Sequence, residues 1–287
     1  IVATNVFLHL HPTRIHRTHV KITHTYCLGG LSFFMFLGLT ITGILLMFYY
    51  VPSVDRAYLD IENIQTNVQF GQLMRNMHRW MAHAMVILVF LHMMRVFYHG
   101  AYKPPREFNW VVGVVLLFLT IMLSFTGYLL PWDQIAYWAI TIGANIAQSP
   151  REVTDALGVT SWFDPGGLQK LLLLGSDQVG EEALIRFYVL HVMILPLALA
   201  ALLAVHFWRV RKDGGLARPA DVDRRLGPPP AGVHPVFTEA PRKTYHLAAI
   251  VRGRTPQVGE APENTLPSLP HLFYAEAGLF MLTVFIC

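Results

Sequence analysis

Long runs of apolar residues, separated by shorter polar segments, give this chain its main pattern. A hydrocarbon core about 30 Å thick is crossed by roughly 20 helical residues, and four of the runs reach that length. They lie at about residues 28–51, 77–98, 110–130 and 183–208. The pattern predicts an all-α membrane protein built on a bundle of four transmembrane helices.

The segments outside these runs have different patterns. Residues 1–27 mix basic, histidine and apolar side chains, which is typical of an amphipathic segment at the membrane interface. Residues 28–212 would form the bundle domain, and residues 213–270 are charged and rich in proline, which favours an extended linker. A fifth apolar run, residues 271–287, is slightly short for a full span. We interpret it as the start of a fifth transmembrane helix at the C-terminus.

Composition supports a membrane location. Hydrophobic residues make up 54% of the chain and charged residues 14%, whereas soluble proteins carry about 25% charged residues. The net charge of +4 does not indicate a nucleic-acid partner, because the basic residues gather at the ends of the apolar runs. There the positive-inside rule accounts for them and places those ends on the cytoplasmic side. An integral, multi-pass membrane protein is therefore expected.

Four histidines lie inside the second and fourth apolar runs at matching intervals. His78 and His92 are 14 residues apart, which on a helix is about 21 Å and roughly 40° of rotation. His191 and His206 are 15 residues apart, again on one broad face. Because one span intervenes, these two spans run in the same direction. His78 would then face His191 near the outer side and His92 would face His206 near the inner side, so that each pair can ligate one haem iron.

Other interpretations of these histidines are less well supported by the sequence. A single buried histidine is more often a hydrogen-bonded core residue than a ligand, but four at paired heights favour two haems. His83 lies about 140° round the helix from His78 and is predicted not to be a ligand. Zinc is disfavoured because no carboxylate or thiol joins either pair. With only two cysteines, and no CxxC or CxxCH motif, a disulfide framework and an iron–sulfur site are not indicated.

Glycines and arginines flank the histidines in a way that suits haem. Two glycine pairs, also 14 residues apart, lie on the first and third spans, where a macrocycle needs close backbone approach; these are Gly29 with Gly43, and Gly113 with Gly127. Ordinary small-residue packing of helices is the alternative. Arg75 precedes His78 by three residues and Arg95 follows His92 by three, close to where haem propionates would need cationic partners. Positive-inside placement alone also accounts for Arg95.

Four motifs resemble cytochrome b of Rieske/cytochrome b complexes, and the resemblance covers about residues 14–212. The motifs are Arg75-Asn-Met-His-Arg-Trp80, Leu91-His-Met-Met-Arg95, Thr126-Gly-Tyr-Leu-Leu-Pro-Trp-Asp-Gln134 and Arg186-Phe-Tyr-Val-Leu-His191. The resemblance implies a low-potential outer haem b on His78 and His191 and a high-potential inner haem b on His92 and His206. It thus implies a di-haem form of the predicted bundle.

Two details resemble the short, split chloroplast-type branch of the family, which works with a separate subunit IV. One is the 15-residue interval between His191 and His206. The other is the segment Tyr26-Cys27-Leu28-Gly29-Gly30, which in that branch carries an additional c-type haem on its cysteine. Arg211 matches the basic residue near the propionate of that haem. From composition alone, Cys27 would be a small buried hydrophobe.

The resemblance also implies a mechanism. Quinol would be oxidised near the outer face at the turn formed by Pro131, Trp132, Asp133 and Gln134, with Tyr137 lining the pocket or an interfacial aromatic belt. One electron would go to a Rieske iron–sulfur protein and the other through the two haems to an inner quinone, with protons moved across the membrane. Asp133 would accept a quinol proton, or else serve only as a solvated turn residue.

Partners follow from the same resemblance. We expect a Rieske protein, a cytochrome c-type subunit or soluble plastocyanin-like carrier, lipid and quinone, in a homodimeric complex. The family's Pro-Glu-Trp-Tyr motif is absent from this sequence. Either another chain supplies the remaining subunit IV-like helices, which is the partner we expect, or the apolar tail from His271 is an addition specific to this branch.

Two competing functions stay open at this point. A di-haem anchor of a quinone-linked dehydrogenase or hydrogenase should lack both the 131–134 turn and the glycine pairs. A haem-free transporter using histidines as a proton relay should show broken helices and inverted repeats. Pro196 is the only predicted helix kink, and no repeat is evident.

Overall fold

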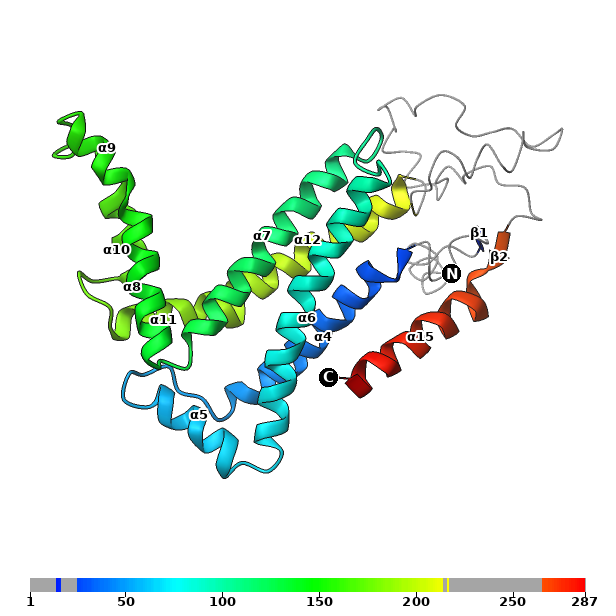
Figure 1. The fold of residues 1–287 in the computed structure, drawn as a ribbon, viewed down its shortest axis with the longest axis horizontal. Helices are drawn as coiled ribbons and strands as arrows, with labels where there is room; N and C mark the ends of the chain where they lie inside the picture. The colour runs from blue at the N-terminus through cyan, green and yellow to red at the C-terminus, as the bar shows by residue number, and fades with distance from the viewer. Residues whose placement is uncertain (1–13, 17–24, 214–215, 217–264, 287) are drawn as a thin grey trace, which may run out of the picture. The chain divides into compact units, whose positions relative to one another are not determined.

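The computed structural model describes residues 14–16, 25–213, 216 and 265–286, and these are nearly all helical (Figure 1). In chain order the elements are β1 (Arg14–His16), α4 (Leu28–Met47), α5 (Ala57–Thr66), α6 (Gly71–Tyr98), α7 (Glu107–Leu129), α8 (Gln134–Gln148), α9 (Pro150–Ala156), α10 (Pro165–Leu174), α11 (Glu181–Val189), the π-helix η1 (Leu190–Ile194), α12 (Leu195–Lys212), β2 (Thr265–Pro267) and α15 (Ser268–Ile286). The predicted helical class is confirmed, with one short strand pair added.

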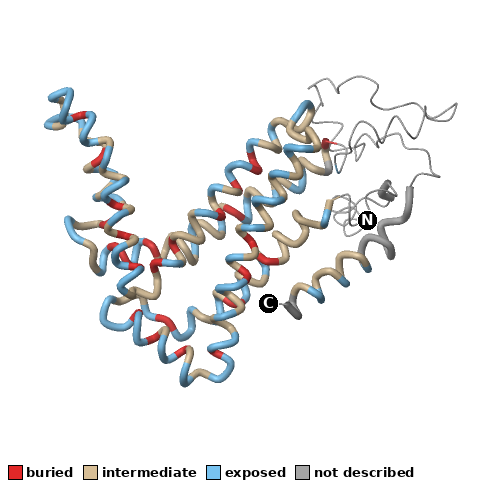
Figure 2. Tube along the Cα trace, viewed as in Figure 1, coloured by how far each residue is buried: buried red, intermediate tan, exposed pale blue. Residues whose placement is uncertain are grey.

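Four helices are long and apolar enough to cross a membrane, as predicted. They are Leu28–Met47, Gly71–Tyr98, Glu107–Leu129 and Glu181–Val210. Little of their surface is buried inside the chain, only 6% of the residues in the most apolar window of the fourth, and Figure 2 shows few buried positions along them. An apolar helix that its own chain leaves uncovered is what a lipid environment accepts.

The fourth span is interrupted where proline occurs. Pro196 has no N–H to donate, and its ring crowds the carbonyl of the residue four positions earlier. The chain forms the wide π-turn η1 just before the proline, and the Leu195 N–H donates a hydrogen bond to the Leu190 carbonyl. The irregularity predicted at Pro196 therefore takes the form of a π-turn, and His191 lies inside it.

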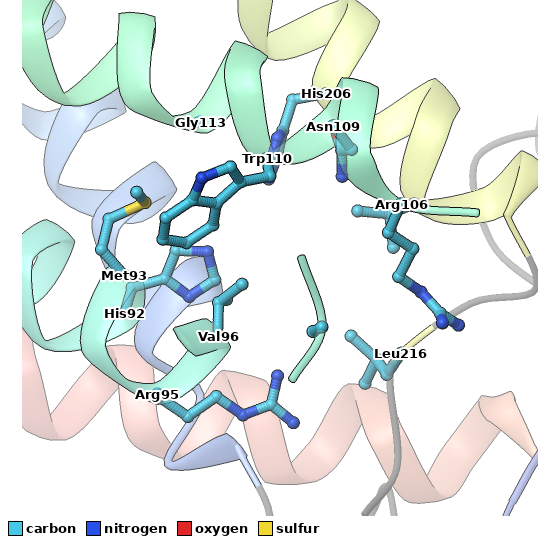
Figure 3. Close-up of a pocket in the computed structure, with 12 residues that line it drawn as sticks. His92, Met93, Arg95, Val96, Arg106, Asn109, Trp110, Gly113, His206 and Leu216 are labelled. Atoms are coloured by element: carbon cyan, nitrogen blue, oxygen red, sulfur yellow. The ribbon is translucent and has the colours of Figure 1, made fainter. Parts of the chain in front are cut away.

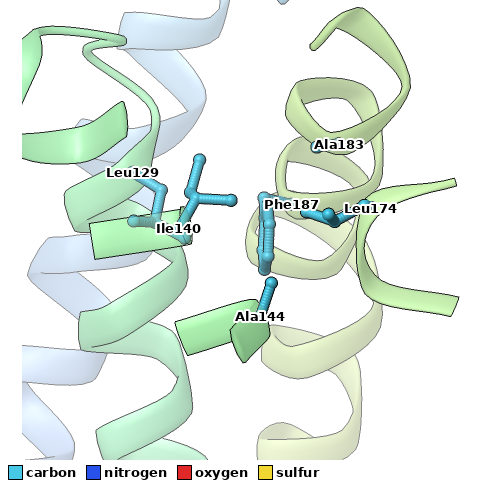
Figure 4. Close-up of a cluster of buried hydrophobic side chains, with 6 residues drawn as sticks. All are labelled: Leu129, Ile140, Ala144, Leu174, Ala183 and Phe187. Atoms are coloured by element: carbon cyan, nitrogen blue, oxygen red, sulfur yellow. The ribbon is translucent and has the colours of Figure 1, made fainter. Parts of the chain in front are cut away.

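Residues 130–180, between the third and fourth predicted spans, contain the three helices α8, α9 and α10. Asp133 accepts the Ala136 N–H at 2.8 Å and starts α8, while Asp164 accepts the Gly167 N–H at 2.8 Å and starts α10. Both are N-terminal caps of the preferred type. The helices pack over a buried apolar cluster, seen in Figure 4, made of Leu129, Ile140, Ala144, Leu174, Ala183 and Phe187.

The chain divides into two compact units, and the boundaries fall inside the long helices. The first unit contains residues 1–36, 84–118 and 200–287; the second contains residues 37–83 and 119–199. The four spanning helices therefore contribute residues to both units, and each unit receives one of the predicted histidine pairs.

Within the first unit the C-terminal segment packs against the start of the chain. Strands β1 and β2 pair antiparallel, with Ile15 opposite Leu266. The Phe280 ring of α15 stacks on the Phe34 ring of α4 with centroids 4.7 Å apart. Helix α15 begins at Ser268, three residues before the predicted start. Most of the predicted interfacial segment and linker lies outside the described residues.

Candidate haem-binding sites

The structure brings both predicted histidine pairs together. In the second unit, the His78 ring of α6 and the His191 ring of η1 have centroids 6.2 Å apart and planes 71° apart. In the first unit, the His92 ring of α6 and the His206 ring of α12 have centroids 6.4 Å apart and planes 77° apart. His83 is in neither pair, and its ring contacts Trp80 instead.

These separations fit two imidazoles on opposite sides of one metal. An imidazole nitrogen bonds a transition metal at about 2 Å, and the ring centroid lies roughly 1 Å beyond it, so two axial rings have centroids about 6 Å apart. Within the described part of the chain, no group of three or more His, Cys, Asp or Glu side chains could hold a metal ion. The donor set at each pair is therefore two imidazoles, which suits axial ligation of haem iron.

Two buried threonines hold one of these pairs. The Thr42 hydroxyl lies 2.9 Å from His78 Nδ1, and the Thr126 hydroxyl lies 3.1 Å from His191 Nδ1. Thr42 and Thr126 are 5% and 4% exposed. Sequence reasoning missed both, although each directly precedes a glycine that it had selected.

Three of the four selected glycines contact the histidine rings themselves. A methyl group on Gly127 would come within 2.5 Å of His191 Cε1. At Gly43 and Gly29 the same atom would lie 3.2 Å and 3.1 Å from the Cε1 atoms of His78 and His92. Gly113 differs, because its nearest neighbour would be the Met93 sulfur at an ordinary 3.5 Å. A side chain at the first three positions would occupy space that the ligand rings need.

A cavity adjoins the His92–His206 pair (Figure 3). The space between its lining residues, open solvent included, is about 560 Å³, and its polar lining includes Arg95, Arg106, Asn109 and Trp110. Asn109 Oδ1 is buried and has no hydrogen-bond partner among the described residues. A cavity lined by two arginines and two imidazoles fits a macrocycle that carries carboxylates. Arg106 and Asn109 were not selected from the sequence.

The remaining predicted cationic residues have different surroundings. Arg75 donates to the Gln65 side chain of α5 at 3.0 Å. Arg95 lines the cavity together with His92. Arg211 belongs to α12, but its side chain lies outside the described residues.

Cys27 lies directly before α4 with a free thiol. Its φ is 50°, in the left-handed region that non-glycine residues seldom adopt. Burial raises the pKa of the Cys27 thiol to about 11, with a further contribution from the charge of Glu276, while a backbone hydrogen bond with Leu31 opposes the shift. A methyl group on Gly30 would approach the sulfur to 2.9 Å, so this glycine makes room for the thiol.

The turn predicted to bind quinol is tightly built. Trp132 has a φ of 54° and packs against buried clusters of the second unit. Its ring is edge-on to that of Tyr137, with centroids 6.5 Å apart. The Tyr50 hydroxyl donates to the Leu130 carbonyl at 2.6 Å, which fixes the start of the turn. Pro131 is partly buried and Gln134 is exposed.

Comparisons with known proteins agree with this geometry. The family model Cytochrome b/b6/petB matches residues 15–214. Cytochrome b6 of Heliobacterium mobile is 43% identical over 204 residues, covering 71% of this chain and 88% of the relative. The menaquinol:cytochrome c reductase cytochrome b subunit of Bacillus subtilis is 42% identical, covering 71% of this chain and 86% of the relative.

A solved structure titled "Hyperthermophilic respiratory Complex III" matches 99% of this chain with a TM-score of 0.71 and 25% identity. The chain spans about 63% of the length of that structure. Together with the family model and the relatives, this match shows that the chain belongs to the cytochrome b/b6 family.

Family membership confirms the resemblance predicted from the four motifs. It makes the chain a membrane electron-transfer protein that carries b haems and works as a subunit of an oxidoreductase. It also decides against the dehydrogenase anchor and the haem-free transporter.

Proposed function

We propose that this chain is the cytochrome b core of a quinol-oxidising complex and conducts electrons between an outer quinol site and an inner quinone site. The observation that carries the proposal is the pairing of four histidines, two on α6 and two on the fourth span, at centroid distances of 6.2 Å and 6.4 Å. Each pair has the separation that axial ligation needs, and both pairs use the same two spans.

The side chains have distinct roles in holding the two haems. His78 and His191 would hold one iron, and His92 and His206 the other, each through a neutral imidazole nitrogen. Haem b, when bound, supplies one-electron exchange at its iron. Arg95, Arg106 and Asn109 would orient the haem of the second pair by hydrogen bonds to its carboxylates. The glycines keep the ligand rings free of steric conflict.

The outer quinol would bind at the turn from Pro131 to Gln134. Trp132 and Tyr137 present aromatic surface there, which suits a quinone ring. The carboxylate of Asp133 is engaged in capping α8 through Oδ1. Its second oxygen can still accept a proton from quinol, and proton acceptance stays part of the proposal.

Cys27, directly before α4, would attach a third, c-type haem through a thioether, with Arg211 near its propionate. The raised pKa of this partly buried thiol disfavours metal ligation, because thiolate is the metal-binding form. This haem would border the inner quinone site.

The partners proposed for the complex follow the family. A Rieske protein would take the first electron and pass it to a cytochrome c-type subunit or a soluble carrier. A chain with subunit IV-like helices would complete the quinol pocket, and the assembly would be a homodimer in a bacterial cytoplasmic or other energy-transducing membrane. The relative from Bacillus subtilis is named for menaquinol, which makes menaquinol the first quinol to test.

The test is a pyridine-haemochrome measurement on the complex purified from its membrane, before and after acidified-acetone extraction. The subunits are then separated on a denaturing gel, so that haem retained by this chain is distinguished from haem carried by a cytochrome c-type subunit. Two extractable b haems and one retained haem per chain are expected. His78→Ala should remove one extractable haem, whereas His83→Ala, five residues away on the same helix, should remove none. Unchanged haem content in His78→Ala would contradict the ligand assignment. Two extractable haems with none retained by this chain would contradict only the proposed attachment of a haem to Cys27.

A further inference from the structure

The hydroxyls of Thr42 and Thr126 determine which nitrogen of their histidines carries the proton. Thr42 Oγ1 lies 2.7 Å from the Gly38 carbonyl oxygen, and Thr126 Oγ1 lies 2.8 Å from the Met122 carbonyl oxygen. A carbonyl oxygen can only accept, so each hydroxyl hydrogen points to its own helix backbone. The hydroxyl oxygen is then an acceptor toward the ring, and Nδ1 of His78 and His191 must be the donor.

This arrangement leaves Nε2 unprotonated in both rings. A neutral imidazole carries one N–H, and the other nitrogen offers its lone pair. With Nδ1–H directed to threonine at 2.9 Å and 3.1 Å, the lone pair on Nε2 is free to bond a metal. Two buried threonines thus select the ligating tautomer at both sides of this pair.

The second histidine pair is built differently. The threonines belong to the dipeptides Thr42-Gly43 and Thr126-Gly127, whereas the corresponding glycines near the other pair follow Leu28 and Val112. His206 Nδ1 is buried and has no hydrogen-bond partner among the described residues. Among the described residues, the two pairs therefore have the same type of ligand but differ in the hydroxyl groups that contact the ligands.

We propose that Thr42 and Thr126 are positioning residues that lower the reduction potential of the haem held by His78 and His191 relative to the haem held by His92 and His206. A hydrogen bond accepted from Nδ1–H makes the imidazole a stronger electron donor. A stronger donor stabilises the ferric iron, which carries the higher charge, and so lowers the potential. The inference rests on the proposed function, because it needs both histidine pairs to be haem ligands.

The direction of this effect matches the direction of electron transfer. Electrons move spontaneously from the lower potential to the higher. Hydroxyls that, within the described part of the chain, contact only the His78–His191 pair therefore favour transfer toward the His92–His206 pair. The hydroxyl groups that make this difference belong to α4 and α7, next to the glycines that contact the ligand rings. It therefore needs no difference in ligand type.

The experiment is a redox titration of the two b haems, followed by visible absorbance, in the purified complex. Thr42→Val and Thr126→Val remove one hydroxyl each and keep a β-branched side chain. Each should raise the midpoint potential of one b haem and leave the midpoint potential of the other unchanged. For a one-electron couple, a tenfold change in the redox equilibrium corresponds to about 59 mV. Thr42→Ser and Thr126→Ser keep the hydroxyl and should return the potential toward the wild type.

Thr141→Val is the matched control. Its hydroxyl makes the same backward hydrogen bond, to the Tyr137 carbonyl at 2.9 Å, but contacts no ligand histidine, so both midpoints should stay unchanged. Both haems bound with unshifted midpoints in the valine variants would overturn the inference, as would an equal shift of both haems. If a valine variant loses one haem while its serine counterpart keeps two with native midpoints, positioning by the hydroxyl is supported. Absence of b haem from the wild-type complex would instead overturn the proposed function.

Discussion

The contact between Gly127 and His191 makes the sharpest test of how the bundle holds its cofactor. In Gly127→Ala, the new methyl carbon would lie 2.5 Å from His191 Cε1 and 3.1 Å from both ring nitrogens. Nonbonded carbon atoms rest about 3.5 to 4 Å apart, so the ring must move by roughly 1 Å. The ring has little freedom, because Nδ1 is hydrogen-bonded to Thr126 on the same helix.

A displacement of that size exceeds what metal ligation tolerates. Ligand distances at metal sites hold to about 0.2 Å, several times less than the required movement. Overpacking a buried site costs about 1 to 3 kcal/mol, which leaves a four-span bundle folded. We therefore expect Gly127→Ala to assemble in the membrane and to lose the haem held by His78 and His191.

The assay is the ratio of extractable haem to protein in the purified complex, together with the redox titration of whichever haem stays. Gly113→Ala on the same helix is the comparison, because its methyl group would meet only the Met93 sulfur at 3.5 Å. Gly127→Ala with two haems at native midpoints would refute the reasoning. If Gly113→Ala also loses a haem, these glycines act by clearing the macrocycle, as the sequence first suggested, rather than by clearing the ligand rings.

Substitutions at three further positions test the turn and the end of the fourth span. Tyr50→Phe should destabilise the complex by about 1 kcal/mol in thermal or denaturant unfolding, because the partly buried Leu130 carbonyl loses its donor. Asp133→Ala should cost about 1 kcal/mol as a lost cap, whereas Asp133→Asn keeps the cap. A fall in quinol oxidation in the asparagine variant would therefore isolate a proton-accepting role. Burial raises the pKa of Asp213, with its partner Arg209 opposing the shift. This group's contribution to stability is present at low pH and lost as pH rises through its folded-state pKa. The melting temperature of the wild type should therefore rise relative to that of Asp213→Asn as pH falls below neutrality.

Sequence periodicity predicted the four spans and the pairing of the histidines. A helix of fixed pitch converts an interval of 14 or 15 residues directly into height and face. His78 could therefore be matched with His191, and His92 with His206, before any contact was known. Helix ends were less predictable. Helix α6 begins at Gly71, because polar residues continue it beyond the apolar run that marked the span.

Local signals for the helices of residues 130–180 were present in the sequence. Asp133 and Asp164 stand where N-terminal caps belong, and Pro150 and Pro165 occupy first turns. The pairing of residues 14–16 with 265–267 could not have been predicted in this way. Its register depends on segments far apart in the chain, with no turn to set it.

Thr42 and Thr126 show what periodicity leaves out. The glycines after them were selected because their interval repeats that of the histidines, and a threonine in an apolar helix has an ordinary explanation in its bond to the preceding turn. Only the positions of the rings reveal that the same oxygen also accepts a hydrogen bond from a ligand. Intervals along a helix predict which residues share a height, but the tautomer and electron-donating strength of an imidazole depend on the atom behind it. The two histidine pairs look alike in the sequence for this reason, and the structure distinguishes them.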